Sequence, residues 1–252
     1  KTHMARRREA YAYVRPASEE EKDFPQVLTI EGTTICLKES SRRTRELTVD
    51  GVYQDDQTRL LDDLSGRLFA QLKNEGDVHM HVLGARGTGK SRCLFGANGE
   101  EGLIAKFADK FYSQRNMRGH AIIDVSVFDV SDEVIYDLLC PGRTGTLRFS
   151  PTGGPWVEGL SRHLAGNKEE FASLLKDALT VKAASLLRKD DLVSHLCIRC
   201  MCSYDAEGGK DPPAHEGTTT FVELASSILE SQSSDAEEVP SVLRASLALS
   251  HM

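Results

Sequence analysis

Residues 84–91 read Gly84-Ala85-Arg86-Gly87-Thr88-Gly89-Lys90-Ser91. The stretch fits the pattern G-x-x-x-x-G-K-[ST] without a mismatch. Glycines allow backbone N–H groups to curl around phosphate oxygens, the lysine bridges the outer phosphates, and the serine hydroxyl is a ligand for magnesium. The motif therefore predicts a loop that binds ATP or ADP, with Mg²⁺ held by Ser91. The alternative interpretation is a glycine-rich turn that binds nothing.

The residues on either side favour the phosphate loop over that alternative. Val78–Leu83 is predicted to be a strand that leads into Gly84, and Ser91–Phe95 is predicted to open a helix. Strand, loop and helix in this order place the N-terminus of the helix against the bound anion.

The rest of the chain alternates between helical and extended patterns. Apolar residues at helical spacing predict helices at Leu60–Leu72, Leu103–Tyr112 and Lys168–Leu187. Alternating or apolar runs predict strands at Ala10–Pro16, Leu47–Tyr53, Ala121–Phe128, Ser194–Tyr204 and Thr218–Leu224, and a hairpin at Gln26–Leu37. Interleaved strands and helices favour one α/β domain over residues 1–252, with a central mixed sheet flanked by helices and a basic N-terminal extension at residues 1–9.

Composition narrows the class of protein. A formal net charge of −7 argues against a protein that coats nucleic acid through non-specific electrostatic binding. No apolar run approaches the roughly 18 residues of a membrane span, so neither nucleic acid nor a membrane is an expected partner. Lys1–Arg8 is basic without a following apolar stretch, which argues against a secretory signal and leaves an organelle transit remnant open.

The six cysteines are scattered, which favours a reducing compartment over a disulfide framework. His195, Cys197, Cys200 and Cys202 also invite a zinc interpretation. A strand through Ser194–Tyr204 sends positions 200 and 202 to one face and positions 195 and 197 to the other. The four side chains then cannot converge on one ion, so a strand core is favoured.

Six short segments around the phosphate loop have the order and spacing of segments in the kinesin motor domain family. They are Tyr13-Val14-Arg15-Pro16, Leu47–Tyr53, Gly102-Leu103-Ile104, Val125–Leu139, Val157-Glu158-Gly159-Leu160 and Ser246-Leu247-Ala248-Leu249. None is specific alone, but their sequential order over nearly the whole chain resembles that family. The resemblance implies a P-loop NTPase fold of the kinesin motor type, in which Arg15 and Pro16 flank the adenine.

The chain departs from the first switch of that family, which reads N-x-x-S-S-R-S-H. With Ser194-His195 setting the register, the asparagine, the two serines and the arginine become Arg188, Asp191, Leu192 and Val193. In the family the second serine helps to hold magnesium and the γ-phosphate. Leu192 has no oxygen to offer in its place.

The second switch of the family, D-L-A-G-S-E, also differs. Here it reads Glu223-Leu224-Ala225-Ser226-Ser227-Ile228. In the family its glutamate pairs with the arginine of the first switch and positions the attacking water. Losing one of these charges would leave its partner buried and unpaired, which would destabilise the protein by about 3–5 kcal/mol. Here both charges are replaced, by Val193 and Ile228, and two apolar side chains can pack on each other. The paired replacement predicts lost hydrolysis; the alternative is a register that is off by a few residues.

Residues that face the microtubule in the family are changed as well. Arg244 replaces the asparagine of its I-N-x-S-L stretch, and the loop before it carries Asp235, Glu237 and Glu238. Because the surface of tubulin is itself acidic, these carboxylates would repel it.

The resemblance and these departures together predict a degenerate kinesin-like domain. It would bind ATP or ADP with Mg²⁺ and act as a non-motile structural or cytoskeletal module in the cytoplasm, on a microtubule or in a protein complex. Two alternatives stay open. One is an active ATP-dependent microtubule motor, and the other is a repurposed subunit of a large assembly that binds no nucleotide.

The resemblance also implies a further strand between the strand at Val14 and the strand before Gly84. In the family this strand follows the segment that matches Ser246–Leu249. Each unpaired backbone group inside a sheet costs about 1–3 kcal/mol, so either the sheet closes up with a changed strand order or another segment fills the position. We expect the second, with later sequence or a partner chain as that segment. We therefore expect residues 1–252 alone to be poorly soluble or partly unfolded.

Overall fold

The computed structural model describes residues 8–16, 28–40, 43–85, 87–114, 120–131, 133–149, 155–186, 194–205 and 214–225. The chain divides into two compact units, Lys1–Asp63 and Leu64–Met252. The assignment of residues 1–252 to one domain, with an extension at 1–9, stays a prediction.

The first unit contains two small sheets. Strands β2 (Leu28–Glu31), β3 (Thr34–Ser40) and β4 (Arg43–Thr48) form an antiparallel sheet, and β1 (Tyr11–Val14) pairs in parallel with β5 (Gly51–Gln54). The hairpin predicted at Gln26–Leu37 is confirmed, with Gly32 at φ +63° in its turn.

The prediction of one extended piece at Leu47–Tyr53 is wrong, because the chain turns there between β4 and β5. Asp50 causes the break: its amide donates to the Ala10 carbonyl at 2.7 Å, and its carboxylate accepts the Ala10 amide at 2.8 Å. This pair of hydrogen bonds starts β5 beside β1.

Helix α1 (Gln57–Glu75) confirms the helix predicted at Leu60–Leu72. Its leucines at helical spacing are all 5% exposed or less: Leu60, Leu61, Leu64, Leu68 and Leu72. The helix begins earlier than the leucine pattern because the Asp56 carboxylate accepts the Arg59 amide at 2.9 Å, as an N-cap residue does.

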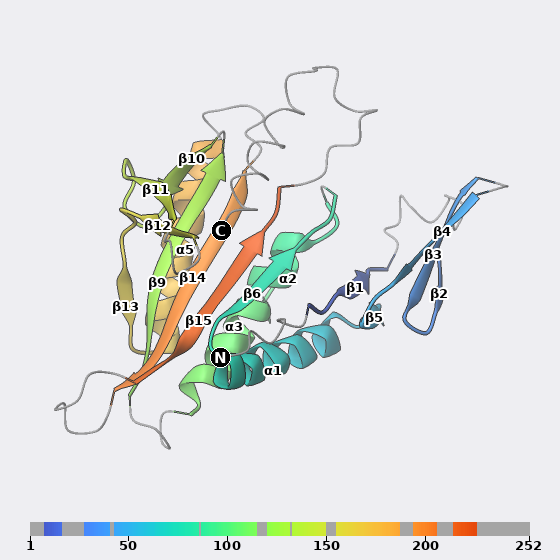
Figure 1. Ribbon diagram of the computed structural model, residues 1–252, viewed down its shortest axis with the longest axis horizontal. Helices are drawn as coiled ribbons and strands as arrows, with labels where there is room; N and C mark the ends of the chain where they lie inside the picture. The colour runs from blue at the N-terminus through green and yellow to red at the C-terminus, as the bar shows by residue number, and fades with distance from the viewer. Residues whose placement is uncertain are drawn as a thin grey trace. The chain divides into compact units, whose positions relative to one another are not determined.

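The second unit is built on an eight-stranded mixed sheet (Figure 1). Seven strands follow one path in the order β12-β11-β10-β9-β14-β15-β6, and β13 pairs with β9 beside that path. The bounds are β6 (Val78–Val82), β9 (His120–Ser131), β10 (Val134–Asp137), β11 (Thr144–Phe149), β12 (Pro155–Glu158), β13 (His163–Ala165), β14 (His195–Asp205) and β15 (Ala214–Glu223). The β15–β6 ladder is parallel and the other ladders are antiparallel. Within the described part of the chain, β6 is paired on one side, by β15.

Among the described helices, α2 (Lys90–Phe95), α3 (Leu103–Tyr112) and α5 (Lys168–Leu186) contact this sheet. A two-residue hairpin, β7 (Gly96–Ala97) and β8 (Glu100–Glu101), joins α2 to α3. Aromatic side chains of α3 pack against the sheet. The ring centroids of Phe107 and Phe221 lie 5.5 Å apart, and those of Phe111 and Tyr204 lie 4.9 Å apart. The predicted fold class, a mixed α/β sheet flanked by helices, is confirmed.

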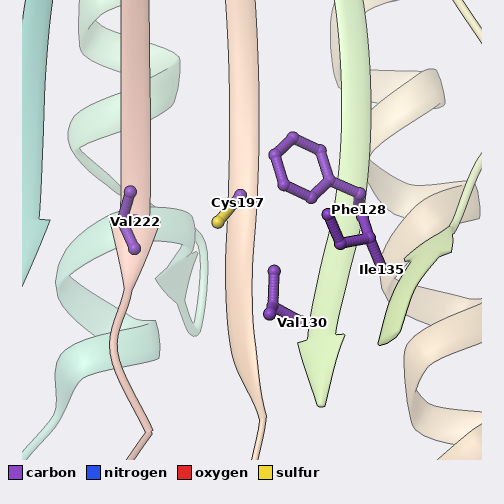
Figure 2. Packing of buried hydrophobic residues seen from close by; sticks show 5 residues of the cluster. All are labelled: Phe128, Val130, Ile135, Cys197 and Val222. Carbon is purple, nitrogen blue, oxygen red and sulfur yellow. The ribbon is translucent and has the colours of Figure 1, made fainter. Parts of the chain in front are cut away.

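The opposite face of the sheet carries a second apolar cluster. Figure 2 shows its five buried members: Phe128, Val130, Ile135, Cys197 and Val222. Strand register places Cys197 opposite Phe128 and Val222, while Cys200 pairs with Val125 on the helix-covered face. The strand predicted at Ser194–Tyr204 is therefore confirmed. The described residues contain no group of three or more potential metal ligands.

Several sequence predictions concern positions outside the described residues. These are Arg86, Arg188, Asp191, Leu192, Val193, Ser226, Ser227, Ile228, Asp235, Glu237, Glu238, Arg244 and the segment Ser246–Leu249. Among the described helices, none combines the length and apolar character that crossing a membrane requires.

Candidate nucleotide site

The phosphate loop lies where the sequence predicts it, between the end of β6 and the start of α2. Two glycines are required by the backbone. Gly84 has φ +156°, and a Cβ there would lie 2.5 Å from the Thr88 hydroxyl oxygen. Gly89 has φ +93° and caps α2, a left-handed conformation that disfavours residues with a Cβ. The described loop residues are thus held in the curled conformation that the motif predicts.

Lys90 folds back over this loop. Its side chain is buried, and its Nζ donates hydrogen bonds to the Gly84 carbonyl at 2.7 Å and to the Ala85 carbonyl at 3.1 Å. Burial lowers the pKa of Lys90, and the charge of Glu223 acts in the opposite direction. The Lys90 amino group therefore lies against the loop, held by two of its carbonyl oxygens.

Ser91 contacts a carboxylate from another strand. Its hydroxyl donates to Glu223 Oε1 at 2.5 Å, and Glu223 is the last residue of β15, the strand that pairs with β6. Parallel neighbouring strands end at the same edge of a sheet, which explains how residues 132 positions apart meet here. The sequence-based site did not include Glu223. The signal was present, because Glu223 is the first residue of the segment aligned with D-L-A-G-S-E.

Comparison with known proteins decides the family. The sequence pattern that defines the kinesin motor domain family matches residues 14–248 of this chain. The chain belongs to the kinesin motor domain family. The resemblance inferred from the sequence is therefore confirmed.

Curated relatives are kinesin-like proteins of much greater length. Mouse KIF14 is 29% identical over 131 residues, which cover 48% of this chain and 8% of the relative. Human KIF16B is 28% identical over 193 residues, 64% of this chain and 15% of the relative. KIN-8A of Oryza sativa subsp. japonica is 26% identical over 213 residues, 82% of this chain and 26% of the relative. The chain thus spans about a quarter or less of each relative's length.

Solved kinesin structures share the fold. KIF14 with ADP in complex with a microtubule superposes with a TM-score of 0.77 at 22% identity, over 96% of this chain and 76% of that one. The two-heads-bound KIF14 dimer with AMP-PNP in complex with a microtubule gives 0.74 at 21% identity, over 94% and 72%.

The oxygen atoms at this kinesin-type loop suit a magnesium ion. Mg²⁺ prefers hard oxygen ligands and is usually held by one or two protein groups together with phosphates. The Ser91 hydroxyl and the Glu223 carboxylate supply two such oxygens side by side, next to the cationic Lys90. The donor set therefore fits magnesium.

The two residues expected at the adenine belong to the first unit of this kinesin motor domain. Pro16 is exposed, and Arg15 Nη1 donates to the Pro16 carbonyl at 3.0 Å. Their role beside the adenine stays a prediction.

Proposed function

We propose that this kinesin-type domain binds ADP or ATP at residues 84–91 together with Mg²⁺, does not hydrolyse it rapidly, and serves as a non-motile module on microtubules or in a protein complex. The observation that carries the proposal is the contact between Ser91 and Glu223 beside the buried Lys90. It assembles the cation, the hydroxyl and the carboxylate that a phosphate–magnesium site needs.

Each of these side chains has one task in the proposal. Lys90 Nζ, now bound to the carbonyls of Gly84 and Ala85, would turn to the outer phosphates of the nucleotide. Ser91 and Glu223 would hold the magnesium ion, which neutralises phosphate charge when bound. Arg15 and Pro16 would flank the adenine, and Gly84, Ala85, Arg86, Gly87, Thr88 and Gly89 would supply the loop backbone.

The sequence supports binding without turnover. Leu192 offers no oxygen to magnesium, and Val193 and Ile228 replace the charge pair that positions water in the family. Positioning and charge stabilisation supply most of the rate in phosphoryl transfer, so a site without these groups is expected to retain nucleotide rather than turn it over.

A working microtubule motor is the second candidate. It is favoured by the KIF14 structures, which hold ADP or AMP-PNP in complex with a microtubule, and by the intact Lys90 and Ser91. The two candidates differ in turnover, which is measured separately from binding.

Titration with fluorescent ADP in the presence of Mg²⁺ tests the binding site. Lys90→Ala should weaken binding roughly 10- to 100-fold, because a charge-assisted contact is worth about 1.5–3 kcal/mol. Lys176→Ala, at an exposed position of α5, is the matched control and should bind as the wild type does. If the wild type shows no saturable binding at millimolar nucleotide, the proposal is wrong and the subunit that binds no nucleotide is favoured.

A further inference from the structure

Ser194 immediately precedes β14 and His195 is the first residue of that strand, and their side chains lie on opposite faces of the sheet. Ser194 faces α5, where Lys182 Nζ donates to its hydroxyl at 2.8 Å and to Asp129 Oδ1 at 2.5 Å. The next side chain, His195, points to the other face, as the strand pleat requires. Ser194 therefore contacts the Lys182–Asp129 ion pair on one face of the sheet, and His195 is available for a contact on the other face.

His195 holds the backbone just after β15. Its imidazole is 2% exposed, and its Nδ1 accepts a hydrogen bond from the Ala225 amide at 3.0 Å. The preceding amide, Leu224, donates to the Val82 carbonyl of β6 at 3.0 Å. The two amides that follow Glu223 are thus both fixed, one by a neighbouring strand and one by a side chain.

The environment of His195 Nε2 indicates that the histidine is needed for the hydrogen bond at its Nδ1. A neutral imidazole that accepts at Nδ1 carries its proton on Nε2. His195 Nε2 is buried and has no hydrogen-bond partner among the described residues. An unpaired buried donor destabilises the fold, and an apolar side chain would remove that cost. Packing alone therefore does not favour histidine here, whereas the bond to Ala225 requires an acceptor.

Ala225 lies two residues after Glu223, whose carboxylate contacts Ser91. We propose that His195 is a positioning residue for the nucleotide site: by holding the Ala225 amide it fixes the end of β15 and keeps the Glu223 carboxylate on the Ser91 hydroxyl. This inference rests on the proposed function. It adds a residue from β14, outside both the loop and the magnesium ligands.

Protonation should break the link. Burial lowers the pKa of His195; among the charged groups nearby, Asp129 acts to raise it and Lys182 acts to lower it. The imidazole is therefore neutral at neutral pH and keeps its acceptor. As pH falls below the ordinary value of 6.5, the protonated form loses the Nδ1 lone pair and with it the bond to Ala225.

The test compares His195→Leu with His195→Asn in the whole chain. Asparagine Oδ1 occupies the same position along the side chain as Nδ1 and can accept the Ala225 amide, whereas leucine cannot. In His195→Leu, hydrogen exchange of the Ala225 amide should accelerate about tenfold, as loss of one hydrogen bond predicts. If Ser91 and Glu223 hold Mg²⁺ as proposed, Mg²⁺ should slow the release of labelled ADP from the wild type, and His195→Leu should lose this effect. His195→Asn should restore both, and Cys197→Ala, which removes a buried side chain from the same face, should leave both unchanged.

Each outcome decides the inference. Wild-type protection of Ala225 and wild-type magnesium dependence in His195→Leu would overturn it. If the wild type binds no nucleotide, the proposed function fails, and the Ala225 exchange rates alone decide whether His195 holds the end of β15. If His195→Leu does not fold, an acid titration of the wild type replaces it. The protection factor of the Ala225 amide, which corrects its exchange rate for the intrinsic slowing at lower pH, should then fall, and an unchanged protection factor would overturn the inference.

Discussion

Asp129 and Lys182 form an ion pair from which solvent is largely excluded. The Asp129 side chain is 7% exposed and that of Lys182 is 17% exposed, and their charged atoms lie 2.5 Å apart. By contrast, Arg148 and Glu158 form a pair at 2.8 Å whose side chains are more than half exposed. Water screens the exposed pair, so only the buried one should matter for folding.

Lys182→Met should lower the free energy of unfolding by about 3–5 kcal/mol, because it leaves the buried Asp129 carboxylate without its partner. Arg148→Met, the exposed counterpart, should cost less than about 1 kcal/mol. Urea unfolding followed by circular dichroism measures both. Adding Asp129→Asn to Lys182→Met should recover much of the loss, and a double variant no more stable than Lys182→Met would argue against a charge effect.

At the scale of elements, close backbone contact fixes the connection from the phosphate loop to α3. The β7–β8 hairpin brings Gly102, at the start of α3, against the end of α2. A Cβ on Gly102 would lie 2.3 Å from the Leu94 carbonyl oxygen and 2.4 Å from the Gly96 amide nitrogen. Gly102 has an ordinary φ of −84°, so it is a close approach, not a special dihedral angle, that requires glycine.

Gly102→Ala should therefore destabilise the protein by about 1–3 kcal/mol, the usual cost of overpacking. Gly66→Ala is the control, since Gly66 lies inside α1 and a Cβ there would meet no atom within 4 Å. It should stabilise the helix by about 0.5–1 kcal/mol. Thermal unfolding of the two variants should shift the midpoint in opposite directions, and a shift in the same direction would contradict the packing argument.

Elements with a strong local signal were predictable from the sequence. The bounds of α3 match the predicted helix, and the leucine spacing located α1. Elements that depend on distant partners were not: β9 extends to His120–Ser131 because β14 pairs with it along its length, and the prediction at Ala121–Phe128 stopped short. The β7–β8 hairpin has too few residues to give a pattern.

The candidate site shows the same division. Its loop could be predicted because the motif is local, and Lys90 and Ser91 were recognised with it. Glu223 was missed because its contact with Ser91 depends on β15 pairing with β6. His195 was assigned to a strand core, and its bond to Ala225 becomes visible only when β14 and β15 lie side by side.

At the scale of the whole molecule, the requirements for the kinesin fold differ from the requirements for ATP hydrolysis. A TM-score of 0.77 at 22% identity shows that the kinesin fold persists through extensive substitution, since alternating apolar strands and a buried helix face tolerate changes that keep the pattern. Hydrolysis depends instead on a few side chains at fixed places, and the proposed function holds that this sequence departs from the family at those positions. Retained fold is therefore weak support for retained turnover.

Phosphate release from ATP, measured with and without microtubules, tests that separation. We expect no microtubule-stimulated turnover above the background set by Lys90→Ala, because loss of even one group that stabilises developing charge commonly costs about 10²- to 10³-fold in rate. In the predicted register, Leu192, Val193 and Ile228 stand where the family pattern has three polar or charged groups. Bound fluorescent ADP in the same preparation provides the control for a folded site. Turnover of about 1 per second or faster, within the usual range of enzymes, would show that the chain is a working motor with unorthodox switches.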